Sequence, residues 1–384
     1  MLRRAFVLLF GTLGLAACGS SNTGAPIAMN QPPGASLGGA GAAAGPVAIL
    51  LPLSGRMGEI GKPMLAAAQL SLSVPGSPVL VVKDTHGTPD GAAQAATEAI
   101  DGGARMILGP LTSAETAQVA PIARRAGVPV LAFTNDHAQA QVGVWTLGIT
   151  PGQQVRRLWG AIRETSKGPV AAVLPDDDFG KAMGDELNRA ASIESQPAPF
   201  VRMTGHGKDD IVAAVNELAV PAASDQPLPY GAILLGATGN DLRVFVRAFA
   251  DAKIDRAKVQ ILGPALWVDP ASGSSAMVGA WFAAPDPATR GTLVRDYTAK
   301  YRQPPSPLAD LASDGASIAR VLAAQGRMNG AGLVQPAGFS GVDGWIGLLP
   351  DGQVRRGLAV FQIERNGRPA KISDAPAGPA PAGS

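Results

Sequence analysis

Short, continuous apolar runs alternate along the chain with alanine-rich segments whose apolar positions have helical spacing. The runs form two series, at residues 47–51, 79–82, 106–108 and 128–131, and then at residues 170–174, 200–203, 232–235 and 259–262. Apolar strands joined by helices are typical of parallel sheets that helices cover on both faces. The pattern therefore predicts an α/β protein of two doubly wound, Rossmann-like lobes with a cleft between them.

Capping residues mark helix starts directly after several of these runs. Thr88 precedes Pro89, a residue that favours the first helical position, and Thr112 and Glu115 have the spacing of a capping box. In parallel sheets, ligands bind beyond the carboxyl ends of the strands, where such helix N-termini point. We therefore expect a binding site in the loops at these strand ends.

The amino-terminal segment has the form of an export signal. Two arginines at residues 3–4 precede an apolar stretch, residues 5–15, that is too short to span a bilayer as a stable helix. Residues 15–18 (Leu-Ala-Ala-Cys) resemble the bacterial lipoprotein box, and Cys18 is the only cysteine in the chain. We interpret residues 1–18 as a lipoprotein signal peptide and Cys18 as the lipidation site that anchors the protein to a membrane. An ordinary secretory signal with an incidental thiol is the alternative.

Low-complexity segments flank the folded body. Residues 19–46 consist mostly of Gly, Ala, Ser, Pro and Asn, and residues 367–384 are rich in Ala, Pro and Gly. Such segments cannot bury enough apolar surface to offset the entropy of ordering the chain. We predict a disordered tether at 19–46, a folded body at 47–366 and a disordered tail at 367–384.

The composition of the 384-residue chain excludes several classes of function. Its 32 Lys and Arg residues and 30 Asp and Glu residues give a net charge of +2, which offers no general attraction for nucleic acid. One cysteine and three histidines leave few groups for metal binding or catalysis, and the sequence has no P-loop, His-Glu-x-x-His or G-x-S-x-G motif. Asp176-Asp177-Asp178 is interpreted as a solvated helix start. We therefore predict a non-enzymatic protein with no cofactor and no metal.

Several loop motifs of the body resemble those of one known family. The motifs are LPLSG at 51–55, ILGPLTS at 107–113, ILGP at 261–264, GAWFAAP at 279–285 and a closing hairpin at 339–352. In this order they resemble the type I periplasmic binding proteins of the leucine-binding family, and the resemblance covers essentially the whole body. It implies two Rossmann-like lobes that are joined by a hinge of several strands.

The resemblance also implies how the chain is divided between the lobes. The first lobe is expected at about 47–145 and 285–328, and the second at about 146–284 and 329–366. The chain would then cross the hinge more than once, and the closing hairpin would return to the second lobe.

Carried over by position, the candidate ligand-binding residues lie on both lobes. They are Thr112, Ser113, Thr134, Asp136, Phe179, Thr238 and Trp267. Ser113 places a hydroxyl at a helix start, which suits an anion, although a plain capping role explains it equally well. Asp136 falls where the family usually has a small hydroxyl, and its charge would repel an acidic ligand. Ala265 stands where the family has a carboxylate that pairs with an ammonium group, which argues against a free α-amino acid as the ligand.

Two functions fit this resemblance. The penicillin-binding-protein activators are outer-membrane lipoproteins of the same fold, and residues 50–55, 107–111 and 129–135 resemble that branch closely. The first hypothesis is therefore a lipid-anchored periplasmic activator, at the outer or inner membrane, whose partner is a bifunctional peptidoglycan synthase. The alternative is the solute-binding component of an ABC importer, with a permease as partner and an amino acid or a related small polar molecule as ligand.

Overall fold

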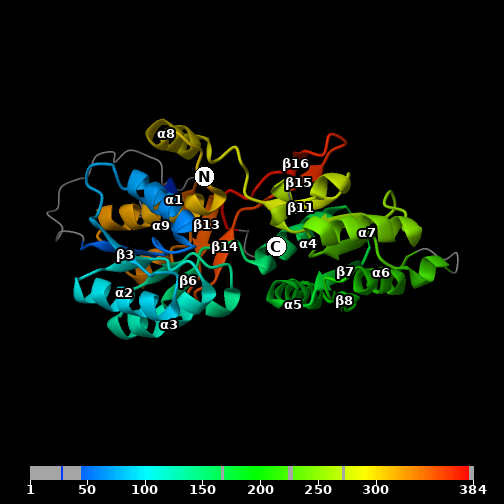
Figure 1. Ribbon diagram of the computed structural model, residues 1–384, viewed down its shortest axis with the longest axis horizontal. Helices are drawn as coiled ribbons and strands as arrows, with labels where there is room; N and C mark the ends of the chain where they lie inside the picture. Colours follow the sequence, from blue (N-terminus) through cyan, green and yellow to red (C-terminus); the bar gives the residue numbers. More distant parts are fainter. Residues whose placement is uncertain (1–26, 29–44, 166–167, 224–227, 270–272, 380–384) are drawn as a thin grey trace, which may run out of the picture.

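Two lobes lie side by side along the long axis of the molecule (Figure 1). The computed structural model describes residues 27–28, 45–165, 168–223, 228–269 and 273–379. Cys18 and most of the predicted tether lie outside these residues. Each lobe is built on a largely parallel sheet with helices on both faces, so the predicted α/β architecture of two doubly wound lobes is confirmed.

The first lobe has a five-stranded parallel sheet in the order β3-β2-β4-β5-β6. Its strands are β2 (Val47–Leu51), β3 (Leu80–Asp84), β4 (Met106–Leu108), β5 (Val130–Ala132) and β6 (Val144–Thr146). Its helices are α1 (Gly58–Ser71), α2 (Pro89–Asp101), α3 (Ser113–Ala126), η1 (His137–Gln139), α8 (Gly291–Tyr301) and α9 (Pro307–Ala324). Helices α1 and α9 pack against each other on one face of the sheet, and α2 and α3 pack on the other.

Strand β2 shows why the sequence has a continuous apolar run at this position. Val47, Ile49 and Leu51 pack in the core cluster that includes α1 and α9, whereas Ala48 and Leu50 pack in the cluster that includes α2 and α3. Side chains of a strand point alternately to its two faces. A strand that is covered on both faces therefore needs an apolar residue at every position, and all five of these residues are fully buried.

A small sheet in the order β1-β12-β13-β14 completes the first lobe. Its strands are β1 (Ile27–Ala28), β12 (Phe339–Gly341), β13 (Gly344–Leu348) and β14 (Val354–Arg356), and the short helix α10 (Gly330–Leu333) precedes them. Phe339, Ile346 and Val354 belong to the same core cluster as β2 and α9. The expectation that residues 329–356 belong to the second lobe is therefore wrong, because their apolar side chains are buried against the first lobe.

The second lobe has a seven-stranded sheet in the order β16-β15-β11-β10-β9-β7-β8. Its strands are β7 (Val170–Pro175), β8 (Val201–Thr204), β9 (Ala232–Leu235), β10 (Gln260–Gly263), β11 (Trp281–Ala284), β15 (Ala359–Ile363) and β16 (Pro369–Ser373). Its helices are α4 (Pro151–Glu164), α5 (Asp178–Ile193), α6 (Lys208–Ala223), α7 (Gly239–Asp251), η2 (Ala265–Val268) and η4 (Ser274–Ala276). Helices α4 and α5 cover one face of the sheet, and α6 and α7 cover the other.

Both predicted low-complexity segments contain a short strand. Residues 369–373 form β16, which pairs antiparallel with β15, so the prediction of a disordered tail is wrong for this part. The hairpin satisfies backbone groups that the edge strand β15 would otherwise leave unpaired. Ile27 and Ala28, within the predicted tether, pair in parallel with β12.

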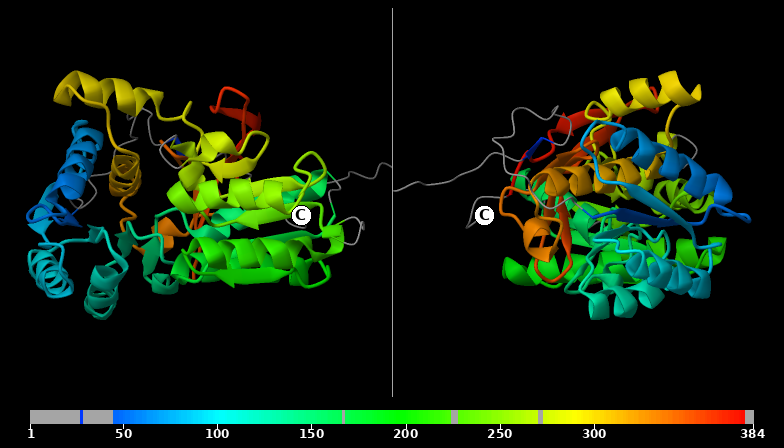
Figure 2. Two further views of the ribbon diagram at one scale, coloured as in Figure 1. Left: turned by 45° about the vertical axis from the view of Figure 1, so that its right-hand side comes forward. Right: turned by 90° about the vertical axis from the view of Figure 1, so that its left-hand side faces the viewer.

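The chain passes between the lobes at three places. These crossings connect β6 to α4, β11 to α8, and β14 to β15. In the left view of Figure 2, the yellow chain that leads into α8 runs from the second lobe to the first. The third crossing is the shortest, since β14 ends at Arg356 and β15 begins at Ala359.

Candidate functional site

The second lobe has a cavity at the carboxyl ends of its parallel strands. Its volume is about 350 Å³. It is lined by Val173, Pro175, Asp177, Phe179, Thr204, Gly205, His206, Ile211, Gly236, Ala237, Thr238, Asp241, Phe245 and Leu266. Ligands of open α/β sheets bind at this edge, and the volume is in the range of small-molecule sites. We call it the lobe-two cavity and treat it as the candidate site.

The lobe-two cavity combines an apolar wall with a charged rim. Val173, Ile211 and Phe245 are buried residues of the main core cluster of this lobe, and their side chains form the apolar part of the lining. Asp177 and Asp241 supply carboxylates at the helix starts. Such a lining suits a ligand with an apolar body and one polar end.

His206 and Asp241 form a hydrogen-bonded pair in this lining. His206 Nδ1 lies 2.7 Å from Asp241 Oδ2, although the residues are 35 positions apart in the sequence. The hydrogen bond to Asp241, together with the charge of that carboxylate, raises the pKa of His206. Asp241 occupies the first turn of α7, where a negative charge is favourable near the positive end of the helix dipole.

Asp177 is the N-cap of α5 and is held in place by that role. Its Oδ1 accepts a hydrogen bond from the backbone N–H of Gly180 at 2.8 Å. Gly180 also lets α5 begin close to the end of β7, because a Cβ there would lie 2.0 Å from the carbonyl oxygen of Pro175. When His206 is protonated, the two carboxylates and the one imidazolium at the rim leave one negative charge.

On the first lobe, Ser113 and Asp136 are joined directly. The Ser113 hydroxyl donates a hydrogen bond to the Asp136 carboxylate, which also accepts from the Ala138 backbone at 2.9 Å and from Gln139 Nε2 at 3.2 Å. Burial raises the pKa of Asp136, but these hydrogen bonds outweigh it and hold the pKa below its usual value. Asp136 therefore presents a negative charge, and the Ser113 hydroxyl is already engaged with it.

Thr112 and Thr134 stabilise loops on the same lobe. Thr112, and not Ser113, is the N-cap of α3, and it forms the predicted capping box with Glu115. Thr134 Oγ1 accepts the backbone N–H of Asp136 at 3.1 Å. The described residues that line the lobe-two cavity do not include Thr112, Ser113, Thr134 or Asp136.

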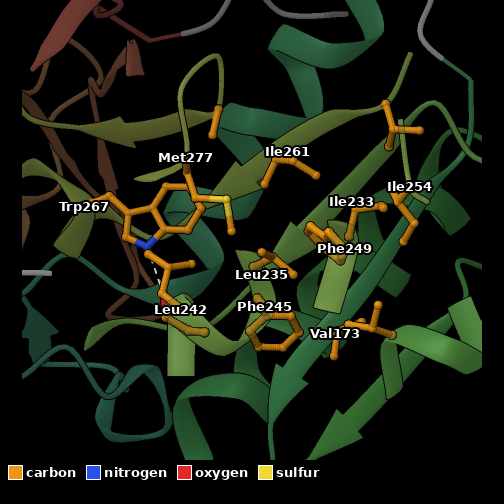
Figure 3. Packing of buried hydrophobic residues seen from close by; sticks show 14 of the residues in the cluster. Val173, Ile233, Leu235, Leu242, Phe245, Phe249, Ile254, Ile261, Trp267 and Met277 are labelled. Carbon is orange, nitrogen blue, oxygen red and sulfur yellow. Dashed lines mark hydrogen bonds between the residues drawn. The ribbon is translucent and has the colours of Figure 1, made fainter. Parts of the chain in front are cut away.

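The second-lobe candidates separate into two groups. Phe179 and Thr238 line the lobe-two cavity, and Thr238 lies at the start of α7. Trp267 does not line it: its side chain is fully buried, and its indole N–H donates to the Ala237 carbonyl at 2.9 Å. Figure 3 shows Trp267 among core residues that include Met277 and Leu242. Trp267 is therefore a packing residue that supports the loop at Ala237, and its assignment to the ligand is corrected.

The structure also adds residues that the sequence reasoning did not assign to the site. His206 and Asp241 line the lobe-two cavity, and so does Asp177, for which the sequence pattern indicates only a solvated helix start. The signal for Asp177 and Asp241 was present, since each lies at a helix start directly after a predicted strand. No local pattern could have paired His206 with Asp241, because only the fold brings the loop after β8 to the start of α7.

Ser54, His86 and Asp84 meet on the first lobe, but not as a catalytic triad. His86 Nδ1 lies 2.8 Å from Ser54 Oγ and 3.2 Å from Asp84 Oδ2. In a triad the serine and the carboxylate bind different nitrogens of the histidine ring, so that a proton can pass through it. Here both groups contact the same nitrogen, so this arrangement does not activate the serine.

The described residues contain neither a metal-binding cluster nor a membrane-spanning helix. In the part of the chain that the structure describes, no group of three or more His, Cys, Asp or Glu side chains is arranged to hold a metal ion. Likewise, none of the described helices has the length and apolar character needed to cross a bilayer.

The sequence profile of periplasmic binding proteins matches residues 46–368. The chain belongs to the periplasmic binding protein family. This match covers both lobes, including the cavity and all three crossings. Members of this family are typically non-enzymatic ligand binders. Among proteins with curated functions, none is significantly similar to the chain.

Several solved structures of similar fold are named as ABC transporters or their solute-binding proteins. A putative branched-chain amino acid ABC transporter protein from Rhodospirillum rubrum has a TM-score of 0.72 and 18% identity, over 85% of this chain and 100% of that one. A substrate-binding protein from Sphaerobacter thermophilus has a TM-score of 0.67 and 17% identity, over 87% and 98% of the two chains. A solute-binding protein from Rhodopseudomonas palustris BisB5, in complex with 3,4-dihydroxybenzoic acid, has a TM-score of 0.59 and 17% identity, over 88% and 99%. At these identities the likeness establishes the fold.

Proposed function

We propose that this protein is the substrate-binding component of an ABC importer and that it captures a small molecule in the lobe-two cavity. The observation that carries the proposal is the cavity itself, about 350 Å³ at the carboxyl ends of β7, β8 and β9, with an apolar wall and a charged rim. Family membership implies that the protein works in the periplasm. The transport proteins among the solved structures support the same function.

The charged rim favours a ligand whose polar end is an amine. Asp177 and Asp241 both line the cavity. Ala265 lacks the carboxylate that would pair with the ammonium group of an amino acid, but Asp177 and Asp241 give an ammonium group another partner. A ligand with a free carboxylate needs a positively charged partner in the cavity, because a buried unpaired charge costs several kcal/mol.

The importer replaces the activator as the first hypothesis. The activator hypothesis rested on local resemblance in the loops, whereas the solved structures of this fold named above support transport. A pull-down with bifunctional peptidoglycan synthases tests the activator hypothesis directly. Recovery of a synthase together with a raised polymerisation rate would return it to first place.

The lipid anchor at Cys18 belongs to the same proposal. An importer component must stay close to its permease, and several acyl chains on Cys18 would keep it at the membrane. Mass spectrometry of protein from the native membrane fraction tests this, since a Cys18→Ser variant would lose the lipid and be released in soluble form.

Thermal unfolding in the presence of small molecules tests the binding function. The screen should compare organic amines, amino acids, neutral amides and carboxylic acids, because a ligand at one hundred times its Kd adds about 2.7 kcal/mol of stability. We expect amines with an apolar body to raise the midpoint. The proposal is wrong if no class of small molecule raises it.

Asp241 offers a matched pair of variants for this screen. Asp241→Asn removes a carboxylate from the cavity, whereas Asp251→Asn removes an exposed one at the far end of the same helix, α7. We expect Asp241→Asn to weaken the binding of an amine at least tenfold and Asp251→Asn to leave it unchanged. Equal affinities in all three proteins would place the ligand elsewhere.

A further inference from the structure

A second cavity lies between the two lobes, and its lining is different from that of the lobe-two cavity. Its volume is about 250 Å³. The first lobe contributes His137, Thr146 and Val354, and the second contributes the start of α4 and one face of α5. We call it the interlobe cavity. None of the described residues that line it also lines the lobe-two cavity.

Glu186 is the centre of a charged cluster in the interlobe cavity. Its carboxylate accepts from Arg156 Nη1 at 3.0 Å, from Arg189 Nε at 2.9 Å and from Arg189 Nη2 at 2.7 Å. The Glu186 side chain is only 10% exposed, so it holds the two guanidinium groups at fixed positions. One buried carboxylate is therefore shared by two arginines.

The cluster has more positive than negative charge. Arg355, on β14, acts on Arg156 as a third nearby cation, while Asp185 is the second carboxylate at the cavity. The two lining guanidinium groups, of Arg156 and Arg189, balance the two lining carboxylates, so the surplus of one positive charge comes from Arg355, which lies near Arg156 but does not line the cavity. The N-terminal end of α4, which begins at the cap Thr150, lies at the same cavity and adds the positive end of a 14-residue helix.

The nearby positive charges act on the pKa of Arg156. Burial lowers the pKa of Arg156, Glu186 acts in the opposite direction, and the charges of Arg189 and Arg355 lower the pKa again. Glu186 accepts from one of the five N–H donors of Arg156, at Nη1, and Arg156, whose side chain is 37% exposed, lines the cavity. A planar guanidinium with free donors matches the oxygens of a carboxylate or phosphate.

We propose that the interlobe cavity is a second binding site, which takes a small oxyanion through Arg156 and Arg189. The anion supplies the negative charge that the cluster lacks. Because His137 and Thr146 form the facing wall on the first lobe, a bound oxyanion contacts both lobes and links them. The proposal does not rest on the importer function, since the two cavities share no described lining residue.

Calorimetric titration of the full-length protein with inorganic phosphate, and separately with citrate, tests the site at constant ionic strength balanced by chloride. We expect Arg156→Gln and Arg189→Gln each to weaken binding of the oxyanion at least tenfold. Arg163→Gln is the matched control, because Arg163 lies on the same helix, pairs with Glu194 at 3.0 Å and does not line the cavity. It should bind as tightly as the unchanged protein.

Three outcomes would overturn the proposal. The first is that neither probe binds at millimolar concentration. The second is that the Arg156 and Arg189 variants bind the oxyanion as tightly as the unchanged protein. The third is that Arg163→Gln weakens binding as much as the Arg156 and Arg189 variants do, which would show a general effect of surface charge. Arg189 is 52% exposed, so its variant should fold even if Arg156→Gln does not, and circular dichroism checks this. Asp241→Asn should leave oxyanion binding intact, which separates this site from the lobe-two cavity.

Discussion

Arg356 donates two hydrogen bonds to the backbone carbonyl of Leu147, from Nε at 3.1 Å and from Nη2 at 2.7 Å. Leu147 lies where the chain first leaves the first lobe, and Arg356 lies where it leaves that lobe for the last time. The remaining terminal nitrogen, Nη1, lies 3.3 Å from Asp314 Oδ2 on α9, and the Arg356 side chain is fully buried. One side chain thus joins two of the three crossings to the core of the first lobe.

Replacing Arg356 with methionine should therefore destabilise the protein strongly. Met fills much of the volume but leaves the buried carboxylates of Asp314 and Asp343 without their cation, and breaking a buried pair costs about 3–5 kcal/mol. Urea unfolding measures the loss. Arg295→Met is the control, since Arg295 pairs with Asp296 on an exposed surface and should change stability by less than about 0.5 kcal/mol. Equal losses in both variants would contradict the role of Arg356.

The buried acids around Arg356 should make stability depend on pH. Burial, and then the charge of Asp343, raise the pKa of Asp310 to about 7 and that of Asp314 to about 7. In the unfolded chain these groups titrate near pH 4. Between about pH 4 and 7 the folded state binds more protons, so the free energy of unfolding should fall as the pH rises through this window.

Asp343→Asn checks this pH dependence. Removing the Asp343 charge should bring the pKa values of Asp310 and Asp314 closer to normal and flatten the fall in stability between pH 4.5 and 7.5. Each unit of pKa is worth about 1.4 kcal/mol, so urea unfolding at the two pH values resolves the difference. Carboxyls with lowered pKa, such as Asp286, act below about pH 4 and in the opposite direction. An unchanged slope in the variant would show that burial alone, and not the charge of Asp343, raises the pKa values of Asp310 and Asp314.

Substitution by alanine should destabilise the protein at Gly61 and stabilise it at Gly160. A Cβ at Gly61 would lie 2.0 Å from the carbonyl oxygen of Pro52, so α1 would have to move from β2, at a cost of about 1–3 kcal/mol. Gly160 is inside α4 with nothing within 4 Å of an added Cβ, and Ala should stabilise the helix by about 0.5–1 kcal/mol. Thermal unfolding of the two variants measures the signs. A stabilised Gly61→Ala would mean that the helix does not approach the strand so closely.

Variants of Trp267 and of its neighbour Leu266 test whether each side chain supports the wall of the cavity or contacts the ligand. Trp267→Ala should cost about 3–5 kcal/mol, because it empties a core position and leaves the Ala237 carbonyl unpaired. Leu266 is 58% exposed and lines the lobe-two cavity, so Leu266→Ala should change stability by less than about 0.5 kcal/mol. Denaturant unfolding and ligand titration on both variants separate the effects. A Trp267→Ala protein of normal stability but reduced affinity would restore Trp267 as a ligand contact.

The strands of both lobes could be predicted from local pattern, whereas the division of the chain could not. The apolar runs at 106–108 and 232–235 coincide with β4 and β9, because a strand that is buried on both faces must be apolar at every position. The closing hairpin at 339–352 has the same local pattern whichever lobe it packs against. Only the burial of Phe339 beside β2 assigns it to the first lobe.

The sequence by itself determined the class of fold and the capped helix starts, because the apolar runs and the caps depend on near neighbours in the chain. The tertiary structure decided which of these elements form the site. Ser113 meets Asp136 across 23 positions, His206 meets Asp241 across 35, and Arg356 meets Leu147 across 209. The energy of such pairs depends on distance and burial, and both are set only when the sheets assemble.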